Sequence, residues 1–152
     1  MRVGLIGCGK NKLPHAAPAS ELYTGPFFKL CKQWISKPGR VDAWGILSAK
    51  HGLVLPDQEL EPYDLSLDKL SYQKRVAWGQ GVRKQLELQW GVNDVIWLIL
   101  AGAYYRVALD GMPFVEDVIA CWTNWRRMAG MKRPQMGIGV IKKYLKRDEG
   151  YY

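Results

Sequence analysis

Apolar positions along this chain alternate between the spacing of strands and the spacing of helices. Near-continuous apolar runs predict strands that are buried on both faces, at residues 2–7, 44–48 and 94–101. Between the first two runs, helical spacing after Thr24-Gly25-Pro26 predicts a helix whose apolar face carries Phe27, Leu30, Cys31 and Trp34. A second helix is expected over residues 71–90, with its inward face formed by Tyr72, Val76, Val82, Leu86 and Trp90.

The remaining elements are shorter. A short helix is expected at residues 103–109, a fourth strand at 114–120 and a basic helix at 139–147, while residues 49–67 are expected to form a long loop. Strands that alternate with helices predict a single α/β domain over residues 1–152, a three-layer sandwich around a mainly parallel four-stranded sheet.

Ligands of such sheets bind outside the carboxyl ends of the strands. The strand-to-helix connections at residues 7–12, 48–52 and 102–105 are therefore expected to open onto one edge of the sheet. This edge is where the sequence places a candidate site.

Length and composition indicate a globular protein with a buried core. The chain has 152 residues, of which 48% are hydrophobic, which is enough to bury a core. The longest apolar run, residues 95–101, is too short to cross a bilayer, and no leader precedes the first strand, so we expect no membrane association. Three cysteines without paired spacing favour a reducing, cytoplasmic location and form no zinc motif.

The net charge of +8 is concentrated near the C-terminus. Between residues 118 and 147 there is no acid, and the basic residues are Arg126, Arg127, Lys132, Arg133, Lys142, Lys143, Lys146 and Arg147. A local basic field favours a phosphate-rich partner, and the adjacent Trp122 and Trp125 could stack on bases. A nucleic acid or a nucleotide is the expected partner, and a solvated surface is the alternative.

The segment after the second strand concentrates reactive side chains. His51, one of only two histidines, can exchange a proton near neutral pH or make a structural hydrogen bond, and Lys50 can hold an anion or lie in solvent. Asp64 can orient water or cap a helix, and Tyr63 can stack on a base or pack in the core. We take Asp64, His51 and Lys50 as the candidate catalytic residues.

The first connection, residues 7–12, combines two glycines with two lysines, which favours close approach of an anion to exposed backbone N–H groups. A tight turn with solvated lysines is the alternative. Carboxylates near His51 match no metal-ligand spacing, so neither a metal nor a cofactor is expected. The candidate substrate-binding residues are Cys8, Gly9, Lys10, Lys12, Tyr23, Thr24, Ser48, Tyr63, Gly102, Tyr104, Arg126 and Arg127.

Several short motifs occur together in this chain. They are Cys-Gly-Lys-Asn-Lys at 8–12, Leu-Tyr-Thr-Gly at 22–25, Leu-Ser-Ala-Lys-His-Gly-Leu at 47–53, Pro-Tyr-Asp at 62–64 and Gly-Ile-Gly at 137–139. The combination resembles a small uncharacterised family of bacterial and phage α/β domains.

A second resemblance is more distant. Gly-Leu-Val-Leu-Pro at 52–56, followed by Pro-Tyr-Asp, is similar to a segment of the core domain of archaeosine synthases, which resembles the uracil-DNA glycosylase fold. The likeness implies an enzyme that handles N-glycosidic bonds or modified bases. The His-Pro-Ser motif of many uracil-DNA glycosylases is missing, and Gly102-Ala103-Tyr104-Tyr105 stands in its general place.

The leading hypothesis is a hydrolase of the N-glycosidase or DNA glycosylase type that acts on a nucleobase. In it, Asp64 stabilises an oxocarbenium-like state and His51 and Lys50 assist the departing base. The alternatives are a hydrolase or transferase of free nucleotides or nucleosides, and a non-catalytic basic protein that binds nucleic acid.

Overall fold

The computed structural model describes residues 1–106 and 110–117. The strands are β1 (Arg2–Gly7), β2 (Ala17–Pro18), β3 (Ala43–Ser48), β4 (Gly52–Val54), β5 (Glu59–Leu60), β6 (Ile96–Leu100) and β7 (Val115–Asp117). The helices are α1 (Ala19–Leu22), α2 (Pro26–Ile35), the 3-10 helix η1 (Leu67–Lys69), α3 (Tyr72–Trp90) and α4 (Ala103–Arg106).

The main sheet has the strand order β4-β3-β1-β6-β7. β3, β1, β6 and β7 run parallel to one another, so the mainly parallel α/β sheet expected from the sequence is confirmed. β4 adds a fifth, antiparallel strand beside β3. It corrects the expectation of an uninterrupted loop over residues 49–67, because a strand of three residues is too short to show alternation in the sequence.

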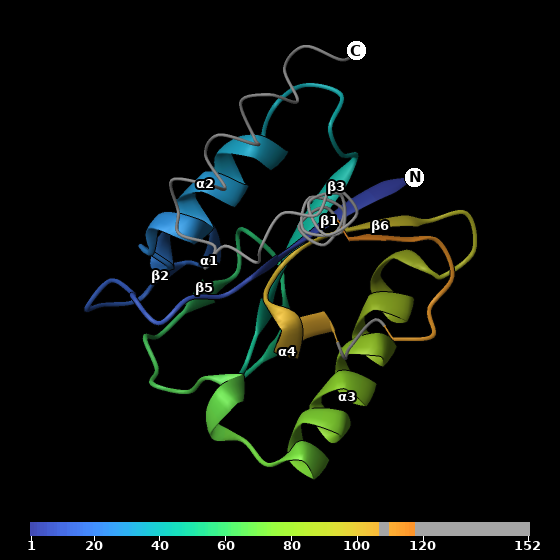
Figure 1. The fold of residues 1–152 in the computed structure, drawn as a ribbon. Helices are drawn as coiled ribbons and strands as arrows, with labels where there is room; N and C mark the ends of the chain where they lie inside the picture. The colour runs from blue at the N-terminus through green and yellow to red at the C-terminus, as the bar shows by residue number, and fades with distance from the viewer. Residues whose placement is uncertain (107–109, 118–152) are drawn as a thin grey trace, which may run out of the picture.

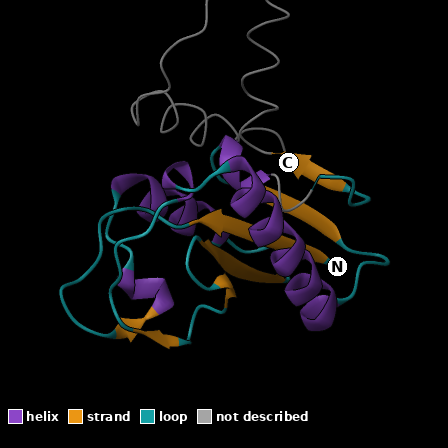
Figure 2. Ribbon diagram, turned by 90° about the horizontal axis from the view of Figure 1, so that it is seen from below, coloured by secondary structure: helices purple, strands orange, loops and turns teal. Residues whose placement is uncertain are grey.

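Helices cover both faces of the sheet (Figure 1). Ile6, Ile46 and Leu98 point to the face that α2 covers, while Leu5, Leu47 and Trp97 point to the face of α3. Neighbouring residues of one strand thus enter different cores, which explains why the strands read as continuous apolar runs. Figure 2 shows α3 lying across the strands.

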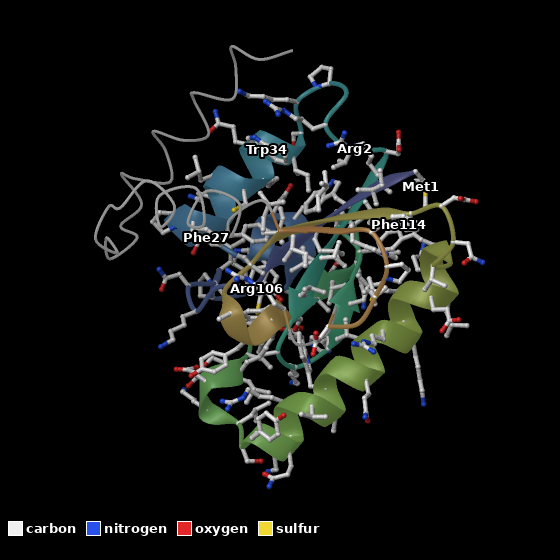
Figure 3. The ribbon with its side chains drawn as sticks, turned by 45° about the vertical axis from the view of Figure 1, so that its right-hand side comes forward. Met1, Arg2, Phe27, Trp34, Arg106 and Phe114 are labelled. Carbon is white, nitrogen blue, oxygen red and sulfur yellow. The ribbon has the colours of Figure 1, made fainter. Side chains whose placement is uncertain are left out.

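α2 begins at Pro26, as the sequence predicts, and its buried residues are Phe28, Cys31, Trp34 and Ile35. The expected apolar face is therefore rotated, and Phe27 and Leu30 are only half-buried. Figure 3 labels Phe27 and Trp34 on this helix. α2 approaches β1 so closely that a Cβ at Gly4 would collide with Ile35, which accounts for a glycine inside this strand.

α3 starts after Ser71, whose hydroxyl accepts a hydrogen bond from the amide of Lys74. The helix continues through Gly79 and Gly81, and its buried residues are Gly79, Val82 and Leu86. Tyr72 is 70% exposed, so the prediction that it turns inward is wrong. Tyr72 lies in the first turn, which extends past the ends of the strands (Figure 1).

Other expectations fall partly or wholly outside the described residues. Of the helix expected at 103–109, the described part is α4, and of the strand expected at 114–120, the described part is β7. Residues 107–109 and 118–152 lie outside the description, and with them Arg126, Arg127 and the expected basic helix. Within the described ranges, no helix combines the length and the apolar character needed to cross a membrane.

Candidate functional site

The connections that follow β3, β1 and β6 meet at the carboxyl edge of these strands. Only the connection after β6 leads directly into a helix, whereas those after β1 and β3 lead to β2 and β4, which corrects the expectation of three strand-to-helix connections. The amide of Cys8 donates to the carbonyl of Leu47 at 2.9 Å, which ties the first connection to the end of β3. The Sγ atom of Cys8 lies 3.2 Å from the hydroxyl of Tyr105, which follows β6. Segments far apart in the sequence therefore share one edge, as parallel strands require.

A chain of three hydroxyl groups forms the centre of this edge. The hydroxyl of Tyr63 lies 2.6 Å from the Oγ atom of Ser48 and 2.7 Å from the hydroxyl of Tyr23. Ser48 is fully buried, and its Oγ atom also accepts hydrogen bonds from the amides of Lys50 and His51. With both lone pairs of Ser48 used in this way, its proton goes to Tyr63, while either tyrosine hydroxyl can donate to the other.

Cations and an imidazole surround the ring of Tyr63. The ammonium of Lys12 lies 4.3 Å from the ring centroid and that of Lys50 lies 5.8 Å from it. The His51 ring packs edge-to-face at 5.4 Å. Tyr63 is thus engaged by protein groups and serves as the packing centre of the site, which leaves less of its ring for stacking on a base.

Burial sets the protonation of these groups. It raises the pKa of Tyr23 and, more strongly, that of Tyr63, so both hydroxyls keep their protons at neutral pH. Burial also lowers the pKa of Lys12. For His51, burial and then the charge of Lys50 lower the pKa, which favours the neutral imidazole.

A hollow of about 210 Å³ lies between the connections that follow β1 and β6 and the segment before η1. It is lined by Cys8, Gly9, Lys10, Leu65, Ser66, Leu67, Asp68, Tyr104 and Tyr105. Cys8, Gly9, Lys10 and Tyr104 are also among the substrate-binding residues expected from the sequence. Asp68 and Tyr105 are not, although Asp68 follows the Pro-Tyr-Asp motif by only four residues.

The three candidate catalytic residues lie outside the lining of this hollow. The side chain of Asp64 is 95% exposed and pairs with Lys69 at 3.3 Å. It caps neither following helix, because Ser66 precedes η1 and Ser71 precedes α3. Lys50 is exposed, whereas His51 is half-buried against Tyr63.

Asp68 carries the carboxylate that lines the hollow. The neighbouring Ser66 hydroxyl, followed by the charges of Lys10 and Lys69, lowers the pKa of Asp68. The group is therefore ionised at neutral pH.

An aromatic side chain stands at the rim of the hollow. Tyr104 is 46% exposed, and the guanidinium of Arg75 lies 4.5 Å from its ring centroid. The arginine also donates to the carbonyl of Leu70, so it is held in place at the start of α3. Figure 3 shows the neighbouring Arg106 on α4.

Two residues of α3 hold the connection that carries Lys50 and His51. Gln85 accepts from the amide of Leu53 at 2.9 Å and donates to the carbonyl of His51 at 3.2 Å. The indole of Trp78 donates to the carbonyl of Ser48 at 2.9 Å. Sequence analysis missed both residues, although Gln85 is a polar residue directly before the buried Leu86.

The remaining candidate residues, Thr24 and Gly102, lie in the segments around the site. The amide of Thr24 donates to the carbonyl of Asn11, which fixes the first connection beside Tyr23. Gly102 is exposed and leads into α4. Within the described part of the chain, no three histidine, cysteine, aspartate or glutamate side chains gather as a metal site would require.

Comparisons with known proteins place the chain among uncharacterised relatives. Residues 3–126 match the model of a family of unknown function, DUF6884. The uncharacterised protein YfjM of Bacillus subtilis (strain 168) is 31% identical over 119 residues, which cover 73% of this chain and 76% of YfjM. No solved structure matches. The expectation of a small uncharacterised family is confirmed, and the chain belongs to DUF6884.

Proposed function

We propose that the protein hydrolyses an N-glycosidic bond of a nucleobase-containing substrate that binds in the hollow at the sheet edge. The observation that carries the proposal is the lining itself, in which a carboxylate (Asp68), a cation (Lys10) and an exposed aromatic ring (Tyr104) face one small space. The resemblance of the Gly-Leu-Val-Leu-Pro and Pro-Tyr-Asp motifs to a segment of the archaeosine synthase core domain, a domain that resembles the uracil-DNA glycosylase fold, is in line with this proposal.

The size of the hollow favours a single base. Its volume of about 210 Å³ corresponds to roughly seven water volumes and is below the ~300 Å³ at which pockets for drug-sized ligands begin. Tyr104, backed by the guanidinium of Arg75, offers a stacking surface that tolerates different bases. An extruded or free base therefore fits better than a dinucleotide.

The reaction requires stabilisation of positive charge on the sugar. The bond between C1′ and the base nitrogen breaks, its electron pair leaves with the base, and the oxygen of water forms the new bond to C1′. A proton released from water neutralises the departing base. Asp68, ionised and next to Ser66, stabilises the oxocarbenium-like state. We assign this role to Asp68 rather than to Asp64, because Asp64 does not line the hollow.

Release of free base tests the proposal. Wild-type protein is incubated with nucleosides, nucleotides and oligonucleotides that carry varied modified bases, and free base is quantified by chromatography with mass detection. Asp68→Asn should reduce the rate of release by about 100-fold or more, the effect of losing one group that stabilises the transition state. Asp57→Asn is the matched control, because this exposed carboxylate does not line the hollow.

Two results contradict the proposal. One is that no substrate of a broad panel releases its base. The other is that Asp68→Asn and wild type release base at equal rates. Tyr104→Ala provides an independent check, because loss of the stacking surface should raise KM more than it lowers kcat.

The basic residues between 118 and 147 favour a second candidate, a protein that binds nucleic acid without turnover. Replacing Arg126, Arg127, Lys132 and Arg133 with glutamine tests whether these residues contact a nucleic acid. If the substrate is a nucleic acid, the variant should lose activity steeply and in a salt-dependent way. If the substrate is a free nucleotide, turnover should be unchanged. Binding that survives alanine at His51, Asp64 and Asp68, without any turnover, favours the non-catalytic candidate.

A further inference from the structure

Lys12 turns its charge toward the protein. Its ammonium donates to the carbonyl oxygen of Gly9 at 3.1 Å and to that of Lys10 at 3.3 Å. It also lies over the ring of Tyr63, and burial lowers its pKa. Two consecutive carbonyl groups of the first connection therefore face the ammonium of Lys12, which acts as a structural cation.

This arrangement fixes where the neighbouring amides point. Peptide units are planar, and none of the described ones is cis, so the N–H of a unit points opposite to its carbonyl. The amides of Lys10 and Asn11 consequently point away from Lys12. Within residues 1–106 and 110–117, these two amides donate no hydrogen bond. The Gly9 amide is oriented separately, because the carbonyl of Cys8 accepts from the hydroxyl of Tyr105 at 3.4 Å.

Two successive unpaired amides, those of Lys10 and Asn11, lie beside the side chain of Lys10 and can donate to an anion. Gly9 and Lys10 line the hollow, whereas Lys12 does not. Gly9 leaves open space on this side, since a Cβ there would meet nothing within 4 Å. We infer that the turn of residues 9–11 binds a phosphate ester of the substrate, with Lys12 acting from behind as a positioning residue.

The inference deepens the proposed function and rests on it only for the base-bearing part of the ligand. Lys10 and Asp68 come from different segments of the chain and both line the hollow, so a phosphate and the sugar that carries it can be bound together there. The substrate class is then a phosphorylated nucleoside, either a free nucleotide or a nucleotide within a nucleic acid.

Binding, measured without turnover, tests the inference. Isothermal titration compares a nucleoside, its 5′-monophosphate, inorganic phosphate and a short oligonucleotide. The monophosphate should bind at least about tenfold more tightly than the nucleoside, the effect of one charge-assisted hydrogen bond. A mononucleotide that outcompetes the oligonucleotide identifies a free nucleotide as the source of the phosphate, and the reverse order identifies a nucleic-acid backbone.

Two variants locate the phosphate. Gly9→Ala should fold normally, because its Cβ has room, yet it should weaken binding of the monophosphate about tenfold by placing a methyl group beside the amides. Gly81→Ala, on α3, is the matched control, since a Cβ at Gly81 also meets nothing within 4 Å. Lys10→Gln should weaken binding several-fold, whereas Lys84→Gln, at an exposed position outside the hollow, should not.

The inference is overturned if the nucleoside binds as tightly as its monophosphate, or if Gly9→Ala binds the monophosphate as wild type does. These results are distinguishable from failure of the proposed function. Phosphate-dependent binding without release of base would contradict the N-glycosidase alone, and release of base without a phosphate preference would contradict this inference alone.

Discussion

At the scale of single residues, Ser48 connects the hydroxyl chain to the backbone of the segment that carries Lys50 and His51. It is fully buried, and its hydroxyl serves two amides and the phenol of Tyr63. A buried polar group is tolerated only when its hydrogen bonds are made. The same residue therefore accepts the hydrogen bonds of two amides in the turn after β3 and orients Tyr63 at the centre of the site.

Replacing Ser48 with alanine should destabilise the fold. The amides of Lys50 and His51 and the hydroxyl of Tyr63 would lose their partner, at a cost of about 1–3 kcal/mol in the free energy of unfolding. Urea denaturation measures this cost. Ser36→Ala, which removes an exposed hydroxyl bonded to Lys32, should cost no more than about 0.5 kcal/mol, and equal costs for the two variants would contradict the role of Ser48.

His51 gives the fold a dependence on pH. Its pKa is lowered below the ordinary value of 6.5 by burial and by Lys50, so the unfolded chain binds a proton more readily than the folded protein. The contribution of the neutral ring is present above pH 6.5 and is lost as the pH falls toward the lower folded value. Tm should therefore fall between pH 7 and pH 5, and less steeply in His51→Gln.

His15→Gln is the control for this measurement, because His15 is exposed and bonds only to the adjacent Ala16 carbonyl in the described structure. If the slope of Tm against pH stays the same in His51→Gln, the imidazole of His51 does not carry the effect.

At the scale of elements, α3 determines the shape of the connection between β3 and β4. Gln85 and Trp78 bond to three backbone groups of this connection. Gly52 has a φ of 74°, and a Cβ there would collide with the amide of Gln85. Helix and turn therefore fit together only with a glycine at this position.

Gly52→Ala should destabilise the protein by more than its backbone strain alone. A left-handed conformation costs alanine about 1–2 kcal/mol, and displacement of Gln85 adds the loss of its hydrogen bonds at about 1 kcal/mol each. Gly39→Ala separates the two effects, since Gly39 has a φ of 76° but a Cβ there meets nothing within 4 Å. If the two variants lose the same free energy of unfolding, the contact with Gln85 contributes nothing to the cost at Gly52.

At the scale of the whole molecule, two cores hold the layers together, one between α2 and the sheet and one between α3 and the sheet. Cys31 belongs to the first core and is almost completely buried. Burial raises the pKa of its thiol to about 12, so the reactive thiolate is rare at neutral pH.

Alkylation of Cys31 should thus report unfolding of the first core. At pH 8, iodoacetamide should label this thiol only when the core opens, and its labelling rate should follow the free energy of unfolding across urea concentrations. Peptide mass spectrometry distinguishes Cys31 from the half-exposed Cys8, which should be labelled in the native protein. Rapid labelling of Cys31 without denaturant would contradict this description of the core.

The sequence by itself determined the order and type of the main elements, because the spacing of apolar residues is a local property that a strand or helix must satisfy wherever it packs. β1, β3, β6, α2 and α3 all lie close to their predicted ranges. The parallel sheet follows from that order, and with it the edge where the connections meet.

Only the tertiary structure decided which polar groups meet at that edge. The bonds between Ser48, Tyr63 and Tyr23 join residues 15 and 40 positions apart, and the hollow brings Cys8, Asp68 and Tyr105 together. The orientation of the carbonyls of Gly9 and Lys10 likewise depends on where the ammonium of Lys12 lies. Such contacts are fixed by the packing of distant segments, and a periodic pattern along one segment carries no information about the side chains that another segment brings to it.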